Sequence, residues 1–180
     1  MKKFFIFLIV LAVIIAAVLA GIIAYVKPAE ALDLAYKEVP IGNKIVDIIK
    51  NRKLEVELTE QDINDIVKKQ LTAHKTLPND VQIEGAKLTL QGTSLVADVN
   101  IRWRDQVPVG AKLNFILAWN NPNIEIRHVS TQIKGINLPG EWLQLAPMVI
   151  PLEQYLPKLI GVKDVLFDEK SVHINLKLLR

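Results

Sequence analysis

The pattern of apolar and polar positions divides the chain into one unbroken apolar run and a longer region of alternating patterns. No residue from Phe4 to Val26 carries a charge, and most are Ile, Leu, Val, Ala or Phe. At ~1.5 Å per helical residue, this run exceeds a hydrocarbon core of ~30 Å. It predicts that residues 1–27 are a cytoplasmic N-terminus and a transmembrane anchor.

Two lysines fix the expected orientation of this anchor. Lys2 and Lys3 precede the apolar run, and short basic flanks stay in the cytoplasm, so the rest of the chain is expected outside the cytoplasm. The alternative is a signal peptide cleaved near Ala29-Glu30-Ala31. A signal peptide has an apolar region of roughly 7 to 15 residues, and this run is longer. We therefore expect a single-pass protein retained in the cell membrane.

Residues 28–53 are predicted to form a stalk that includes a short amphipathic segment. After Pro40 the apolar residues follow helical spacing with lysine and aspartate between them; they are Ile41, Ile45, Val46, Ile48 and Ile49. Two interpretations of this segment remain open. It packs on the core of the domain, or it lies on the outer membrane surface.

Residues 54–180 are predicted to form the extracytoplasmic β-rich domain, which begins with a strand and a helix. Leu54, Val56 and Leu58 alternate with glutamates, which is typical of a half-buried strand. Thr59 follows as an expected helix N-cap. The next apolar residues have helical spacing and predict about three turns with one apolar face; they run from Ile63 to Leu71.

An antiparallel meander is predicted next. Alternating residues on both sides of Gly92-Thr93 indicate a hairpin with a two-residue turn, and the face from Leu95 to Trp103 is apolar throughout. The alternation changes parity at Gly85 and again near Arg127 and His128, which predicts two β-bulges. Bulges bend strands, so the sheet is expected to be strongly curved.

The pattern changes again between Leu138 and Ile160. Apolar residues from Trp142 to Leu159 follow helical spacing, but prolines interrupt them, which predicts a kinked helix. A final hairpin is expected up to Leu178. The predicted fold is therefore α+β: a transmembrane helix followed by a curved antiparallel sheet of about five to seven strands, packed on one amphipathic helix and one proline-broken helix.

Charge and composition exclude several functions. Removing Lys2 and Lys3 from the 22 Lys and Arg leaves 20 against 19 Asp and Glu. Such a domain lacks the clustered positive charge that nucleic-acid binding requires. The absence of cysteine excludes a disulfide scaffold, thiol chemistry and a lipidated cysteine.

The patterns of reactive residues predict no catalytic residue, metal site or cofactor. The histidines lie in three separate elements without the spacing of metal ligands; they are His74, His128 and His173. The serines at turns or in strands lack the GxSxG motif; they are Ser94, Ser130 and Ser171. Asp62 and Asp65 fit favourable charges at a helix start. We therefore expect no enzyme.

The long apolar faces allow two interpretations. They are an ordinary core covered by the helical segments, or they line a groove that accepts an acyl chain. The residues predicted to line the groove are Val99, Ile101, Trp103, Leu113, Phe115, Leu117, Trp119, Leu152, Tyr155 and Leu156. Burial alone does not separate the two interpretations, because both predict it.

The order of these parts resembles the YpmS family, a group of uncharacterised membrane-anchored proteins of low-GC Gram-positive bacteria. The resemblance depends on the anchor, LEVELTEQDIN at 54–64, the hairpin around Gly92, PVGAKL at 108–113 and KGINLP at 134–139 with the segment that follows. The order is more distantly similar to tubular lipid-binding (TULIP-like) envelope domains. That likeness implies lipid binding by analogy of fold.

These observations lead to one expected function and one alternative. The first is a membrane-anchored extracytoplasmic module that binds lipid or another amphiphile in the cell envelope. The alternative is a structural or interaction module that docks an envelope protein without a ligand. The expected partners are therefore the membrane and a lipid or envelope protein, and not nucleic acid.

Overall fold

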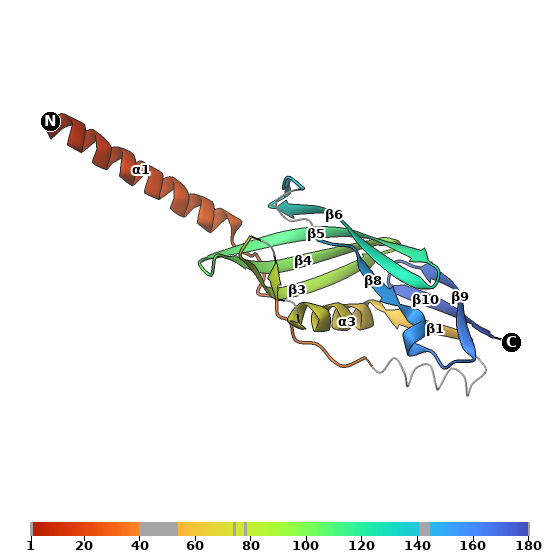
Figure 1. Cartoon of the computed structure of the whole chain (residues 1–180). Helices are drawn as coiled ribbons and strands as arrows, with labels where there is room; N and C mark the ends of the chain where they lie inside the picture. The colour runs from red at the N-terminus through yellow and green to blue at the C-terminus, as the bar shows by residue number, and fades with distance from the viewer. Residues whose placement is uncertain (1, 40–53, 74, 78, 141–144, 180) are drawn as a thin grey trace.

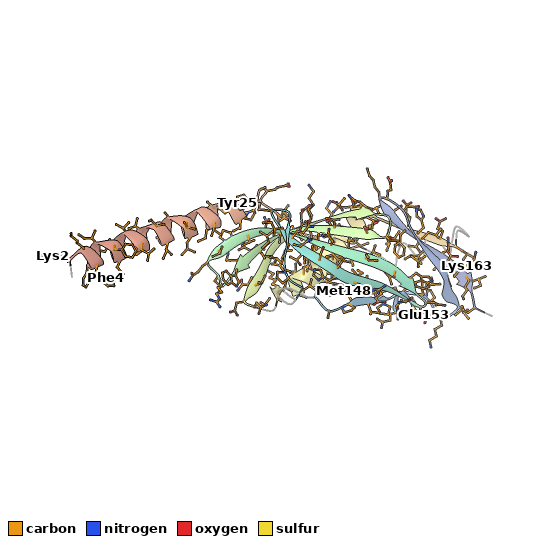
Figure 2. The ribbon with its side chains drawn as sticks, turned by 90° about the horizontal axis from the view of Figure 1, so that it is seen from above. Lys2, Phe4, Tyr25, Met148, Glu153 and Lys163 are labelled. Carbon is orange, nitrogen blue, oxygen red and sulfur yellow. The ribbon has the colours of Figure 1, made fainter. Side chains whose placement is uncertain are left out.

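The computed structural model describes residues 2–39, 54–73, 75–77, 79–140 and 145–179. The amphipathic segment predicted at 41–50 and Trp142 lie outside these ranges. Helix α1 (Lys2–Val26) is long and apolar enough to cross a membrane, and none of its residues is buried. It projects from one end of the β-rich domain (Figure 1), with its side chains between Phe4 and Tyr25 pointing away from the helix axis on all sides (Figure 2).

The domain consists of two antiparallel sheets. The larger follows the order β2-β3-β4-β5-β6-β7, and β8 also pairs with β6. Its strands are β2 (Thr76–Leu77), β3 (Val81–Gln91), β4 (Ser94–Trp103), β5 (Val107–Asn120), β6 (Asn123–Ile133), β7 (Ile136–Asn137) and β8 (Met148–Pro151). The smaller sheet has the order β1-β10-β9, with β1 (Glu55–Thr59), β9 (Ile160–Phe167) and β10 (Ser171–Leu178). The α+β class with a curved antiparallel sheet is confirmed (Figure 1).

Both predicted bulges are present in the larger sheet. Between β3 and β4 the register shifts between Ile83 and Gly85. Between β5 and β6, Asn114 pairs with Ser130 and Phe115 with His128, so Val129 is the extra residue. The sheet curls strongly (Figure 1). We call its concave side, which carries the buried residues, the inner face, and the convex side the outer face.

The two ends of the curl are distinguished by where α1 joins the domain (Figure 1). Pro28, two residues after α1, lies against Gly110 near the start of β5. We call this the near end; β4 ends there at Trp103 and pairs with Val107 of β5. The opposite end is the far end, where β5 turns into β6 and where the smaller sheet lies (Figure 1).

The predicted proline-broken helix is wrong in its described part. Met148–Pro151 is a strand, paired with β6, and only Leu152–Tyr155 (η1) is helical, as one 3-10 turn. The prolines explain both elements, because Pro151 lacks the N–H that a continuing helix requires, whereas a short edge strand tolerates it. Apolar residues at spacings of three and four here reflect a strand followed by a turn.

Helix α3 (Glu60–Ala73) begins as predicted and covers the open edge of β3. Thr59 and Asp62 form a reciprocal cap: the Asp62 N–H donates to Thr59 Oγ1 at 3.3 Å, and the Thr59 N–H donates to Asp62 Oδ2 at 2.9 Å. The Asn64 side chain both accepts from the Leu88 N–H and donates to its carbonyl, each at 2.7 Å. Because these contacts use the free groups of β3, they prevent pairing with another strand.

Residues 28–39, expected as part of a stalk, lie along the outer face, and we call them the strap. The Asn100 amide donates to the Glu30 carbonyl at 2.8 Å, and the Ala86 N–H donates to the Asp33 carbonyl at 3.1 Å. At Gly85 the backbone of Leu32 occupies the space that a Cβ would fill. The strap thus crosses β5, β4 and β3 and fastens α1 to the sheet.

Beyond β3 the strap reaches α3. The Lys37 N–H donates to the buried Asp65 carboxylate at 3.2 Å. Lys68 contacts Asp33 at 3.2 Å and Lys69 contacts Glu38 at 2.9 Å. The strap therefore joins α1, the outer face of the sheet and α3 into one connected unit.

Candidate functional site

The inner face is a continuous apolar surface made by alternate residues of neighbouring strands. Leu95, Ala97, Val99 and Ile101 of β4 are buried, as are the matching residues of β5 from Val109 to Leu117 apart from Phe115, which is half-buried. Side chains alternate across a strand, so the residues between them face the outer side. Helix α3, β8 and η1 cover this surface from the concave side.

Two cavities remain inside this cover. The near cavity, about 70 Å³, lies between α3 and strands β3, β4 and β5; Leu88, Val99 and Leu113 line it. The far cavity, about 100 Å³, lies between α3, the smaller sheet, β6 and η1; Leu58, Leu152 and Ile174 line it. Val67 of α3 and Ile126 of β6 line both, so the cavities adjoin along the length of the curl.

Eight of the ten predicted groove residues line these cavities. Four are in the near cavity, namely Val99, Ile101, Leu113 and Phe115. Four are in the far cavity, namely Leu117, Leu152, Tyr155 and Leu156. Tyr155 is 48% exposed although it lines the far cavity, so its ring lies between the cavity and solvent.

The two predicted tryptophans line neither cavity. Trp103 is at the near end of β4, where the Arg104 guanidinium lies 5.0 Å from the centre of its ring. Trp119 is at the far end of β5, paired with Ile124. Both are half-buried against the core. The two tryptophans therefore lie at opposite ends of the curl.

The prediction missed two walls of the cavities. Val67 and its neighbours Ile63 and Ile66 on α3 form one wall. Val172, Ile174 and Leu176 of β10 form another wall of the far cavity. The helical spacing and the alternation that place these residues on apolar faces were visible in the sequence. Their position opposite β5 and β6 depends on how the two sheets pack together. The apolar pattern within each segment does not predict that packing.

The cavities are small for a ligand. A preformed pocket for a small molecule usually measures about 300–1,000 Å³, whereas an apolar cavity of about 150 Å³ is enough for benzene. With volumes of about 70 and 100 Å³, the two cavities have room for short apolar groups and not for a long chain. A longer ligand therefore requires α3, β8 or η1 to move away from the sheet.

One polar cluster has the order of groups found in a hydrolytic triad. Ser171 Oγ lies 3.0 Å from His173 Nε2, and His173 Nδ1 lies 2.7 Å from Glu55 Oε1. However, Asp168 Oδ2 is 3.3 Å from the same Nε2, so a carboxylate competes with the serine for it. None of these four residues lines a cavity described above. We interpret the cluster as a tie between β1 and β10.

A metal site would need several of the remaining titratable groups close together. Among the residues that the structure describes, no three His, Cys, Asp or Glu side chains gather closely enough to hold a metal ion. Burial lowers the pKa of His128, which lies against Phe115 and within 2.9 Å of the Thr131 hydroxyl. His74 is outside the described residues.

Comparisons of the chain with protein-family models, curated proteins and solved structures give no match.

Proposed function

We propose that this chain is a membrane-anchored extracytoplasmic module that binds the apolar part of an amphiphile, foremost a lipid acyl chain, inside the curled sheet. The observation that carries the proposal is the pair of adjoining apolar cavities between the inner face and α3. The YpmS resemblance agrees with the membrane anchor, and the TULIP-like resemblance agrees with lipid binding. They belong to the proposal, since the comparisons identify no family.

The energetics favour an apolar ligand. Transfer of a methylene group from water into an apolar site contributes about 0.8 kcal/mol, and empty apolar space forfeits dispersion contacts that a chain would restore. A dozen methylenes would offer roughly 10 kcal/mol before the cost of ordering the chain and opening the site. The element to be displaced is smallest at η1, which is a single turn.

Photocrosslinking of the full chain tests this proposal. The protein is reconstituted in vesicles that contain a phospholipid with a photoactivatable acyl chain, and labelled peptides are identified by mass spectrometry. We expect labels in α3 and β5, around Val67 and Leu117, as well as in α1. Labels confined to the anchor, from Phe4 to Val26, would contradict lipid binding by the domain.

The orientation of the anchor is part of the proposal, supported by Lys2 and Lys3 before the apolar run. A reporter that is active only outside the cytoplasm, fused after Arg180, is expected to be active, and the whole chain should remain in the membrane fraction. An inactive reporter, or release of a fragment that begins near Leu32, would contradict this topology.

A second candidate function is docking of an envelope protein, and the unpaired edge of β9 at the far end favours it. Within the described part of the chain, β9 pairs only with β10, so its other edge offers free backbone groups. Leu159 and Leu178 beside it are 70% and 67% exposed. An extended segment of a partner could add to this edge as a further strand. Crosslinks from a photoreactive residue at Leu166 to another protein, without acyl labels in the domain, would favour docking over lipid binding.

A further inference from the structure

A groove with charged side chains in its lining lies beside the strap at the near end, on the outer face of the sheet. Its volume is about 390 Å³, within the usual range for a ligand site. Three lysines from three elements line it, namely Lys27 after α1, Lys112 of β5 and Lys134 after β6. We propose that this groove binds the phosphate of an anionic lipid headgroup in the leaflet that the anchor enters.

The position of the groove matches the depth of lipid headgroups. Lys27 follows Val26, the last residue of α1, and the apolar run is long enough to cross the ~30 Å hydrocarbon core. The Lys134 ammonium lies 5.9 Å from the centre of the Tyr25 ring, and tyrosines are enriched at the membrane interface. Both ammonium groups are therefore held where the membrane meets water.

The charges of the groove leave two lysines available. Asp98 is paired with Lys112 at 2.8 Å, and Glu30 lies 3.9 Å from Lys87. Within the described ranges, Lys27 and Lys134 have no carboxylate partner. A lysine ammonium on a flexible stem is a common ligand of phosphate. Both lysines line the groove, so we assign their ammonium groups to one phosphate bound there.

The anchor makes a lipid the appropriate source of this phosphate. Because α1 fixes the groove at the bilayer, every headgroup in the leaflet is presented at high effective concentration. A phosphate in solution has no such advantage. The inference depends on the anchor and not on the apolar interior, so the headgroup site and the acyl site can fail independently.

The test uses the full chain in bilayer discs of phosphatidylcholine with a minor fraction of phosphatidylglycerol. Native mass spectrometry measures the ratio of the two lipids that stay bound to the protein. We expect phosphatidylglycerol to be enriched roughly fivefold to thirtyfold over the bilayer, the range for one or two lysines near the surface. The enrichment should fall at high salt, because these ammonium groups are exposed.

Variants assign the enrichment to the groove. The pair Lys27→Gln and Lys134→Gln should abolish it, whereas Lys27→Arg and Lys134→Arg should keep it. The pair Lys163→Gln and Lys177→Gln removes the same charge from exposed positions on the smaller sheet, and should leave the enrichment unchanged. Changing Lys2 and Lys3 to Gln measures how much of the phosphatidylglycerol enrichment comes from the basic residues at the other end of α1. Bound lipid of bulk composition in the parent, or equal enrichment in the Lys27/Lys134 glutamine variant, would overturn the proposal.

Discussion

The inner and outer faces of the curled sheet are covered by different kinds of contact. On the inner face, α3, β8 and η1 pack through apolar side chains, and two cavities remain between them and the sheet. On the outer face, the strap lies directly on backbone at Gly85 and is held by single hydrogen bonds such as Asn100 to Glu30. The contacts on the inner face depend on the volume of the apolar side chains. The contacts on the outer face depend on the space above the backbone at Gly85 and on single hydrogen-bond donors.

This difference indicates which face can change shape. Apolar packing is non-directional, so side chains on the inner face can rearrange around a ligand without losing specific bonds. The strap has no such freedom, since the Leu32 backbone fills the space at Gly85 and the Glu30 carbonyl is bound by the Asn100 amide. The strap also holds α3 through Lys37 and Asp65, so we expect the sheet, the strap and α3 to stay in place while η1 moves.

The largest expected effect comes from changing one of two neighbouring residues on opposite faces. Leu117 is 5% exposed inside the far cavity, whereas Ile116 is 43% exposed on the outer face. Leu117→Gln should lower the free energy of unfolding by about 2–5 kcal/mol, because it removes apolar contacts and buries an amide. Ile116→Gln should change it by less than about 0.5 kcal/mol. Thermal unfolding of both variants measures the difference, and equal losses would contradict the assignment of faces.

Gly85→Val should have the next largest effect, and it acts on the outer face. The new side chain collides with the Leu32 backbone, so the strap must shift and its bond to Ala86 is lost. We expect a loss of about 1–3 kcal/mol in stability and faster proteolysis within residues 28–39. Gly140→Val is the matched control, since a Cβ there meets none of the described residues within 4 Å. A strap that remains protected in Gly85→Val would contradict the close contact.

A smaller effect is expected at the edge of β3. Asn64→Ala removes two hydrogen bonds to Leu88 and leaves a partly buried N–H and C=O without protein partners. The expected loss is about 1–2 kcal/mol, and hydrogen exchange at Leu88 should accelerate. Gln70→Ala, an exposed change on the same helix, should alter neither quantity. Unchanged exchange in Asn64→Ala would show that α3 does not protect this edge.

The smallest effect is a pH dependence of the contact between strap and α3. The Lys68 ammonium lowers the pKa of Asp33 below 3.8, and Lys69 lowers that of Glu38 below 4.5. A lowered carboxyl pKa means that the contribution is complete above the ordinary value and is lost as the pH falls through the lowered one. Because the chain has no cysteine, spin labels on cysteines introduced at Ala35 and Gln70 report the distance between the strap and α3. The distribution of this distance should broaden only below about pH 4.5. Broadening that begins near neutral pH would point to other groups.

Local signals account for what the sequence predicts correctly. The Thr59 cap, the turn at Gly92 and the bulge at Gly85 each depend on a few adjacent residues, and the structure confirms all three. The segment around Met148 was predicted wrongly, because short apolar runs with prolines fit an edge strand as well as a broken helix. The strap contact at Gly85 joins residues 53 positions apart in the chain, so no periodicity reveals it.

For the candidate site too, local patterns predict which residues share a face, but they do not predict contacts between distant segments. Alternation along β4 and β5 predicts that Val99 and Leu117 share one apolar face, and they do. It does not predict that Trp103 and Trp119 end at opposite ends of the curl, outside both cavities. The volume left between α3 and the sheet depends on how side chains from six or more elements interdigitate, which no single segment determines.

Filling the space beside Val67 tests most directly whether the interior has room for an acyl chain. Val67 lines both cavities, so the ring of Val67→Phe should occupy empty volume. We expect an unchanged or raised melting temperature together with loss of acyl crosslinks around Leu117. Val129→Phe, at an exposed bulge residue, should leave the crosslinks intact. A clear fall in the melting temperature of Val67→Phe, as overpacking of a filled core produces, or crosslinks equal to those of the parent, would contradict the account.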